Sequence, residues 1–266
     1  MYLKHFGLSK MPFENVCDGE FFYASEMHSE AFSRISYAIE NKKSCVLLTG
    51  GYGTGKTFVA EKLKSDFSKR GYVFSFTVNP RLDGLGLLKT VFYNFTGYPA
   101  PKAKEDVLIA LEKFLKDVYK DGKHAVAVVD EAQSIENEDV FEELRLLLNY
   151  QNEKRSLITL LLCGQSELND RIYSNRQFSQ RIFLSYSLKP FDSASSSDYM
   201  DHRLKIAGAS REIFSLSSKN LIYERSGGIA RWINNISNMA LLEAFSSQAD
   251  SVSENHVSEA IKSFKE

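Results

Sequence analysis

The sequence predicts an α/β fold in which a mainly parallel sheet, which we interpret as five-stranded, precedes a small bundle of helices. Three observations lead to this prediction. A glycine-rich loop separates an apolar run from a helical pattern within residues 45–63. Two further apolar runs, 125–129 and 157–163, are typical of strands buried on both faces of a parallel sheet. Beyond residue 190 only helical periodicity remains.

Composition narrows the class of protein. The 266 residues suit one large domain, or a core domain with a smaller appendage. A net charge of −1 does not favour non-specific binding of nucleic acid by the chain as a whole. Three cysteines, odd in number and far apart, favour a reducing compartment over a disulfide framework or a zinc site. Without a run long enough to span a membrane or a signal-peptide pattern, we expect a cytoplasmic protein with no direct membrane insertion.

The first segment, residues 1–41, is rich in aromatic side chains up to Tyr23 and has helical spacing from Ser25 to Asn41. The aromatic residues are too dense for a solvated tail. We expect this segment to pack on the α/β domain, and a sharper alternative is that it also forms a wall for adenine, because a base needs apolar surface.

The loop itself has the pattern Gly-x-x-x-x-Gly-Lys-Thr, which is typical of a phosphate-binding loop when it lies between a strand and a helix. Its glycines allow backbone N–H groups to converge on an anion, and the helix that follows adds its positive end. The lysine supplies a charge for the outer phosphates of ATP, and the threonine hydroxyl can bind Mg²⁺. We therefore assign nucleotide binding to Gly50, Gly51, Tyr52, Gly53, Thr54, Gly55, Lys56, Thr57 and Phe58.

Further strands and helices alternate after the loop. Residues 72–78 form a predicted strand, and helices are expected at 85–95, 104–119, 141–150 and 166–173. The last strand is expected at 183–188. Four helices then follow, at about 197–207, 217–225, 231–245 and 253–264. These patterns predict a nucleotide-binding α/β domain over residues 1–189 and a helical lid over residues 190–266.

Two carboxylates at the end of the apolar run 125–129 are the strongest catalytic candidates. Asp130 can hold Mg²⁺ through water while Thr57 binds it directly. Glu131 follows at once, so its side chain points elsewhere, where it can polarise a water for in-line attack on the γ-phosphate. Acidic pairs at strand ends are common, and the phosphate-binding loop is what makes this pair significant.

Two amide side chains follow the ends of predicted strands. Gln165 follows the run 157–163 and can orient the attacking water or sense the γ-phosphate; the alternative is a turn residue that bonds the backbone. Asn79 can hydrogen-bond Glu131 and hold it back until activation; the alternative is a simple Asn-Pro turn.

Three arginines are candidates for stabilising charge on the phosphates. Arg176 and Arg181 lie before the last strand, where either can act on a neighbouring subunit, and we favour Arg181. For each of these two, the alternative is a surface or intrachain salt bridge. Arg231 begins a helix of the lid and can reach back to the phosphates, which would couple the bound nucleotide to the position of the lid.

The chain resembles the AAA+ ATPases and, within them, the secretion ATPases of the ExeA/GspA type. The likeness extends over essentially the whole chain. It implies that Asp130 and Glu131 are the Walker B pair, that Gln165 is sensor 1 and that Arg231 is sensor 2. The usual proline before the sensor arginine is replaced here, in Gly-Ile-Ala-Arg. The matching pieces are Phe6-Gly7-Leu8, Pro12-Phe13, Phe22-Tyr23-x-Ser25, Tyr37-Ala38-Ile39-Glu40, the loop, Asp130-Glu131-Ala132-Gln133, Leu144-Arg145-Leu146-Leu147, Gly164-Gln165-x-Glu167-Leu168, Gln180-Arg181-Ile182, His202-Arg203-Leu204 and Trp232-Ile233-Asn234.

This resemblance implies a Mg²⁺-dependent ATPase that forms a homo-oligomer and acts on a protein assembly such as a secretion or pilus system. Because the sequence ends after the lid helices, it is closest to short, soluble relatives without membrane or peptidoglycan-binding regions. The alternative is an ATP-dependent regulator of transposition, of the TnsC/TniB type, that binds duplex DNA as an oligomer. A scaffold that binds nucleotide without hydrolysing it is disfavoured, because Lys56, Asp130 and Glu131 are all present.

Overall fold

The computed structural model describes residues 2–152 and 155–264, which fall into two compact units. The sheet unit consists of Ser29–Gly51 and of the described part of Lys56–Leu188. The helical unit consists of Tyr52–Gly55 and the described parts of Met1–His28 and Lys189–Glu266. This grouping differs from a division at residue 189, because the first 28 residues and part of the glycine-rich loop belong with the C-terminal helices.

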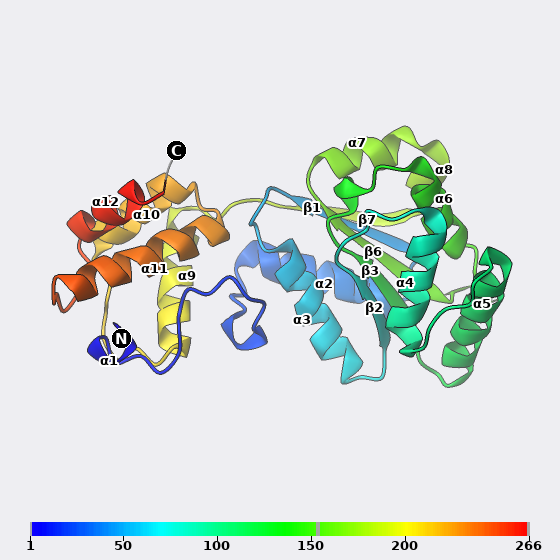
Figure 1. Cartoon of the computed structure of the whole chain (residues 1–266), viewed down its shortest axis with the longest axis horizontal. Helices are drawn as coiled ribbons and strands as arrows, with labels where there is room; N and C mark the ends of the chain where they lie inside the picture. The colour runs from blue at the N-terminus through cyan, green and yellow to red at the C-terminus, as the bar shows by residue number, and fades with distance from the viewer. Residues whose placement is uncertain (1, 153–154, 265–266) are drawn as a thin grey trace. The chain divides into compact units, whose positions relative to one another are not determined.

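A five-stranded parallel sheet forms the centre of the sheet unit (Figure 1), as the sequence predicts. Its strand order is β2-β3-β6-β1-β7. Every residue of β1, β3 and β6 is buried, because helices cover both faces of these central strands. The bounds are β1 (Cys45–Gly50), β2 (Val73–Thr77), β3 (Ala125–Val129), β6 (Ile158–Gly164) and β7 (Ile182–Leu188).

The helices of the sheet unit follow the predicted order, with small shifts at their ends. Asp83 accepts a hydrogen bond from the Gly86 N–H and so caps α4, which ends at Gly97 in the left-handed conformation. Apolar residues of α4 to α8 and one face of the sheet form a continuous core. The bounds are α2 (Glu26–Glu40), α3 (Lys56–Ser68), α4 (Gly84–Thr96), α5 (Lys104–Lys120), α6 (Glu138–Leu147), α7 (Glu167–Ser174) and α8 (Arg176–Ser179). The sequence did not predict α8, nor the short antiparallel pair β4 (Gln151–Asn152) and β5 (Arg155–Ser156).

The helical unit contains the four predicted C-terminal helices and residues 2–28 of the N-terminal segment. We expected that segment to pack on the α/β domain, but its first 28 residues belong to the helical unit. The Tyr2 hydroxyl donates to the Asn238 Oδ1, and Arg203 donates to the Glu14 carbonyl. Burial of aromatic residues such as Phe6 among these helices explains the difference. The bounds are α1 (Tyr2–His5), α9 (Ser193–Ile206), α10 (Leu216–Ser226), α11 (Ala230–Ser246) and α12 (Glu254–Lys262). None of the described helices is long and apolar enough to cross a membrane.

His124, just before β3, makes the fold sensitive to acid. The Thr159 hydroxyl donates to the Lys43 carbonyl, so it accepts a hydrogen bond from the His124 Nε2–H. Burial lowers the pKa of His124 from 6.5 to about 4, with a smaller effect of Lys42. Between these values the unfolded chain binds a proton that the folded chain does not. Acid therefore reduces stability as the pH falls from 6.5 to about 4.

We expect the free energy of unfolding to fall by about 2 kcal/mol through His124 between about pH 7.5 and about pH 5. Urea unfolding at the two pH values measures this change. His124→Gln keeps a donor for Thr159 without titrating, and should flatten the pH dependence by that amount. An equally steep pH dependence in the variant would contradict the assignment.

Candidate functional site

The loop after β1 leads directly into α3, and Lys56 is the first residue of that helix. The Lys56 side chain is buried, and its Nζ donates to the carbonyls of Gly50 and Gly51, each at 2.9 Å. These contacts hold the ammonium group at the carboxyl end of β1. Phe58 is half-buried two residues further along the same helix.

Thr57 and Asp130 come together at the carboxyl ends of two strands. β1 and β3 both flank β6, and the Thr57 hydroxyl donates to Asp130 Oδ2 at 2.6 Å. The other oxygen of Asp130 accepts a hydrogen bond from the Glu131 N–H at 3.0 Å. Burial raises the pKa of Asp130, and the hydrogen bond from Thr57 opposes this effect. Sequence positions 73 residues apart therefore meet in one polar pair.

This pair fits Mg²⁺ in its chemistry. Mg²⁺ prefers hard oxygen ligands and usually takes only one or two from the protein, together with phosphate oxygens and water. A hydroxyl and a buried carboxylate oxygen 2.6 Å apart provide two such ligands. Groups of three or more His, Cys, Asp or Glu side chains that would hold a metal by themselves do not occur in the described parts of the chain.

Glu131 lies two residues after the end of β3 and does not continue its extended backbone. Its backbone has φ 53°, in the left-handed region, which is rare for a residue other than glycine and turns the side chain away from the strand. The Gln133 Nε2–H donates to Glu131 Oε2 at 2.5 Å. The sequence predicted that Asp130 and Glu131 point in different directions, but it did not single out Gln133 as the partner.

Gln165 follows β6, and its backbone N–H donates to Gln133 Oε1 at 3.0 Å. Asn79, after β2, accepts a hydrogen bond from the Arg81 N–H at 3.4 Å. The expected bond between Asn79 and Glu131 is not formed in this structure, where Gln133 bonds that carboxylate instead. The contact of Asn79 with the Arg81 N–H is the one expected from the alternative interpretation, an Asn-Pro turn.

Arg231 contacts the glycine-rich loop within the helical unit. Its N–H donates to the Gly53 carbonyl at 3.4 Å, and its guanidinium carbon lies 4.5 Å from the centre of the Tyr52 ring. The lid arginine expected to act near the phosphates thus touches the segment Tyr52–Gly55. Its contact with a bound phosphate stays a prediction.

His28 is a further contact of this loop segment that the sequence did not reveal. The Thr54 carbonyl can only accept, so the His28 Nε2–H donates to it, at 3.0 Å. The neutral ring then accepts at Nδ1 from the Ser25 hydroxyl at 2.7 Å, and burial lowers the pKa of His28. A Cβ at Gly55, whose φ is 97°, would lie 2.8 Å from this ring, so only glycine fits. The one sequence feature that could have indicated a role for His28 is its position three residues after Ser25, which its ring contacts.

The aromatic N-terminal segment is mostly core. Phe6, Phe13 and Phe21 are buried in the helical unit. Tyr23 lies against Phe191, with ring centres 5.8 Å apart. These aromatic side chains therefore pack within the helical unit rather than on the sheet unit, and the adenine wall stays a prediction.

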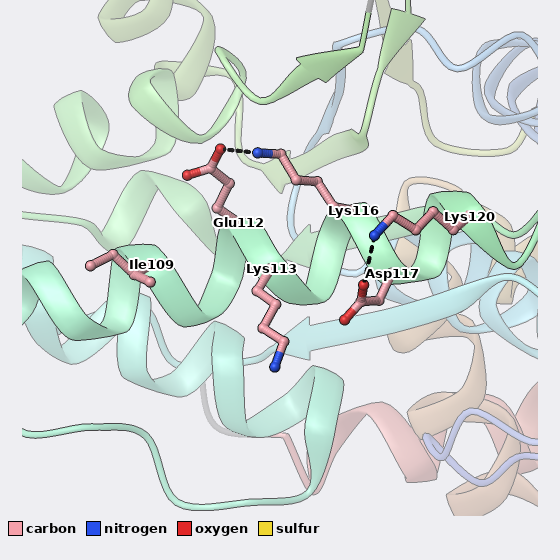
Figure 2. Close-up of a pocket in the computed structure, with 6 residues that line it drawn as sticks. All are labelled: Ile109, Glu112, Lys113, Lys116, Asp117 and Lys120. Carbon is pink, nitrogen blue, oxygen red and sulfur yellow. Dashed lines mark hydrogen bonds and ion pairs between the residues drawn. The ribbon is translucent and has the colours of Figure 1, made fainter.

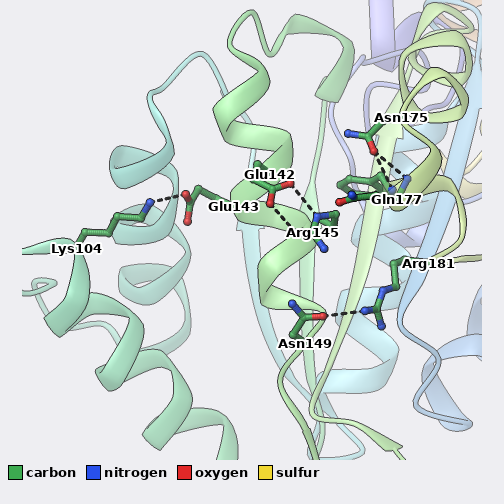
Figure 3. Close-up of polar contacts among 9 residues, drawn as sticks. Lys104, Glu142, Glu143, Arg145, Asn149, Asn175, Gln177 and Arg181 are labelled. Atoms are coloured by element: carbon green, nitrogen blue, oxygen red, sulfur yellow. Dashed lines mark hydrogen bonds and ion pairs between the residues drawn. The ribbon is translucent and has the colours of Figure 1, made fainter.

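The two arginines before β7 differ in their surroundings. The Arg181 Nη2 donates to the Asn149 Oδ1 at 2.9 Å (Figure 3). Arg176 begins α8 and is exposed, and no partner of its guanidinium occurs among residues 2–152 and 155–264. We favoured Arg181 from the sequence. Because the Arg181 guanidinium already bonds Asn149, we predict instead that Arg176 acts on a neighbouring subunit, and the roles of both arginines stay predictions.

Arg176→Ala is expected to lower ATP hydrolysis by about 10³-fold, because an arginine that acts across subunits contributes on this scale. Arg181→Ala should have an effect of less than about threefold, since a half-exposed hydrogen bond contributes little. Mixing each variant with Lys56→Ala protein restores an interface that pairs an intact nucleotide site with an intact arginine. Steady-state phosphate release should therefore recover in the Arg176→Ala mixture. A larger loss in Arg181→Ala would reverse the assignment.

Comparisons with known proteins identify the family of the chain. A family model described as AAA domain matches residues 39–172, half of the chain. General secretion pathway protein A of Aeromonas hydrophila is 34% identical over 255 residues, which cover 92% of this chain and 45% of that protein. The chain therefore spans less than half the length of this curated relative.

Solved structures of low sequence identity share the fold. Cdc6p of Pyrobaculum aerophilum matches with a TM-score of 0.73 at 15% identity, covering 93% of this chain and 71% of that one. The ORC2 protein of Aeropyrum pernix matches with a TM-score of 0.65 at 20% identity, covering 94% and 68%. The RuvB branch migration motor of Thermotoga maritima matches with a TM-score of 0.65 at 16% identity, covering 96% and 73%. These structures show the fold. The family model and the 34% identity to General secretion pathway protein A show that the chain belongs to the AAA+ family and is of the ExeA/GspA type.

Proposed function

We propose that this chain is a Mg²⁺-dependent ATPase that forms a homo-oligomer and uses ATP to switch its action on a protein assembly such as a secretion or pilus system. The contact between Thr57 and Asp130 carries the proposal, because it joins a hydroxyl and a carboxylate suited to Mg²⁺ beside Lys56. Glu131 stands next to this pair with its own orientation. Such a set of groups suits phosphoryl transfer to water.

The residues have separate roles in the proposed reaction. Lys56 binds the outer phosphate oxygens by its charge, while backbone N–H groups of the loop bind phosphate oxygens and the helix end favours their negative charge. Thr57 and Asp130 would hold Mg²⁺, which when bound neutralises charge on the phosphates. Glu131 accepts a proton from the attacking water, and Gln165 orients that water. Arg176 of one subunit stabilises charge on the γ-phosphate of its neighbour.

The protein partner is proposed from the name of the curated relative, a general secretion pathway protein. Its 34% identity over most of this chain supports a related role. We propose a cytoplasmic location, because three cysteines, odd in number and far apart in the sequence, favour a reducing compartment.

Duplex DNA is the alternative partner, and the charges on α5 do not favour it. Figure 2 shows a surface pocket on this helix, lined partly by lysines. Lys116 pairs with Glu112 at 2.6 Å, and Lys120 pairs with Asp117 at 3.6 Å. The pocket is lined by Lys113, Lys116 and Lys120, and acidic neighbours compensate the last two, as expected for a solvated face rather than a phosphate-binding stripe.

Steady-state ATP hydrolysis with and without duplex DNA, combined with sizing in each nucleotide state, tests the proposal. We expect Mg²⁺-dependent hydrolysis and an ATP-dependent oligomer in the absence of DNA. Strong stimulation by DNA together with an oligomer that forms only on DNA would instead establish the transposition-type alternative.

A further inference from the structure

Gln133 links Glu131, which follows β3, to Gln165, which follows β6. Its Nε2–H donates to Glu131 Oε2 at 2.5 Å, and its Oε1 accepts from the Gln165 N–H at 3.0 Å. The orientation of the amide follows from these partners. A carboxylate oxygen accepts a hydrogen bond and a backbone N–H donates one, so a flipped amide would oppose like groups at both ends.

The structure leaves room for this bridge at Gly164, the last residue of β6. A Cβ at Gly164 would lie 2.8 Å from Gln133 Oε1 and 2.6 Å from Leu168 Cδ2. Because both distances are too short for real contacts, a larger residue would displace the amide. Glycine at this position therefore allows Gln133 to reach the backbone of Gln165.

Glu131 needs such support, because it lies beyond the regular hydrogen bonding of β3. Its backbone is in the left-handed region and its side chain is half-buried. Among residues 2–152 and 155–264, the described partner of its carboxylate is Gln133. The bond occupies Oε2 and leaves Oε1 to accept a proton from water.

We propose that Gln133 is a positioning residue that holds the Glu131 carboxylate for attack by water and ties it to the end of β6 at Gln165. This inference rests on the proposed ATPase function, in which Glu131 is the base. An amide suits the task because it donates a hydrogen bond without itself taking up or releasing a proton. A small displacement of a catalytic group is costly, on the order of 100-fold for about 1 Å.

Two substitutions test the two hydrogen bonds of the Gln133 side chain. Gln133→Met keeps the length of the side chain and removes both bonds. Gln133→Glu keeps an acceptor for the Gln165 N–H but replaces the donor to Glu131 with a second carboxylate. We expect kcat to fall by about 10- to 100-fold in both variants, with the dissociation constant of a fluorescent ADP within about twofold of wild type. Gln151→Met, at an exposed position, is the matched control and should behave as wild type.

The decisive experiment combines each Gln133 variant with Glu131→Ala and measures kcat, ADP affinity and thermal melting. If Gln133 acts through Glu131, its loss lowers kcat in the wild-type background and changes nothing further in Glu131→Ala. Additive losses of kcat, or parallel losses of ADP affinity and melting temperature, would show a merely structural role and overturn the inference. Wild-type kcat in Gln133→Met would also overturn it, while the ATPase proposal stands. Absence of hydrolysis in the wild-type protein would overturn both.

Discussion

Replacing Glu131 with glutamine is expected to lower kcat for ATP hydrolysis by roughly 10²- to 10³-fold while ATP remains bound. A general base contributes on this scale, and the amide cannot take a proton from water. Lys56, Thr57 and Asp130 are untouched, so nucleotide affinity should stay within about twofold of wild type. Because ATP is then trapped, the oligomer should be more stable. Single-turnover phosphate release and sizing with ATP measure the two effects.

Glu136→Gln is the matched control for this experiment. Glu136 lies five residues along the chain and is largely exposed, with a long 3.9 Å pair to Arg81. It should hydrolyse ATP at the wild-type rate. Hydrolysis at the wild-type rate in Glu131→Gln would refute the assignment of Glu131 as the base.

Lys56→Ala is expected to weaken ATP binding by roughly 10- to 100-fold, and hydrolysis should fall with it. Hydrogen bonds to charged groups contribute about 1.5–3 kcal/mol, and each 1.4 kcal/mol is about tenfold in affinity. The substitution also removes two hydrogen bonds to the carbonyls of Gly50 and Gly51. Titration with a fluorescent ATP analogue measures the affinity.

Lys69→Ala controls for the loss of charge, because Lys69 is exposed just beyond the end of α3. It should bind ATP as the wild type does. Since Lys56 also supports the loop, melting temperature is measured in parallel. Unchanged ATP affinity in folded Lys56→Ala protein would contradict the placement of the phosphates at this loop.

The centre of the fold and the contact between Thr57 and Asp130 were predictable from the sequence, because both depend on local patterns. Continuous apolar runs predict buried strands, and parallel strands bring their carboxyl ends to one edge of the sheet. Thr57, after the loop that follows β1, and Asp130, directly after β3, therefore meet there. The roles of these residues in hydrolysis remain predictions.

The contacts of the remaining residues depend on geometry that residue patterns do not encode. Gln133 reaches Glu131 because that glutamate adopts a positive φ, and no spacing rule indicates this. His28 contacts Thr54 across 26 residues through tertiary packing. The hydrogen bond between Arg181 and Asn149 joins residues 32 positions apart, which the sequence also does not indicate. These contacts follow from backbone conformation and tertiary packing, not from residue spacing.

The most direct test of the account is phosphate release from ATP by the purified chain, measured with Mg²⁺ and with excess chelator. At a protein concentration at which sizing shows an oligomer, we expect hydrolysis with Mg²⁺ and a loss of at least about 100-fold with chelator. Thr57→Ala should approach the chelated rate even with Mg²⁺. Equal rates with and without Mg²⁺, or bound ATP that the Mg²⁺-loaded oligomer does not hydrolyse, would contradict the account.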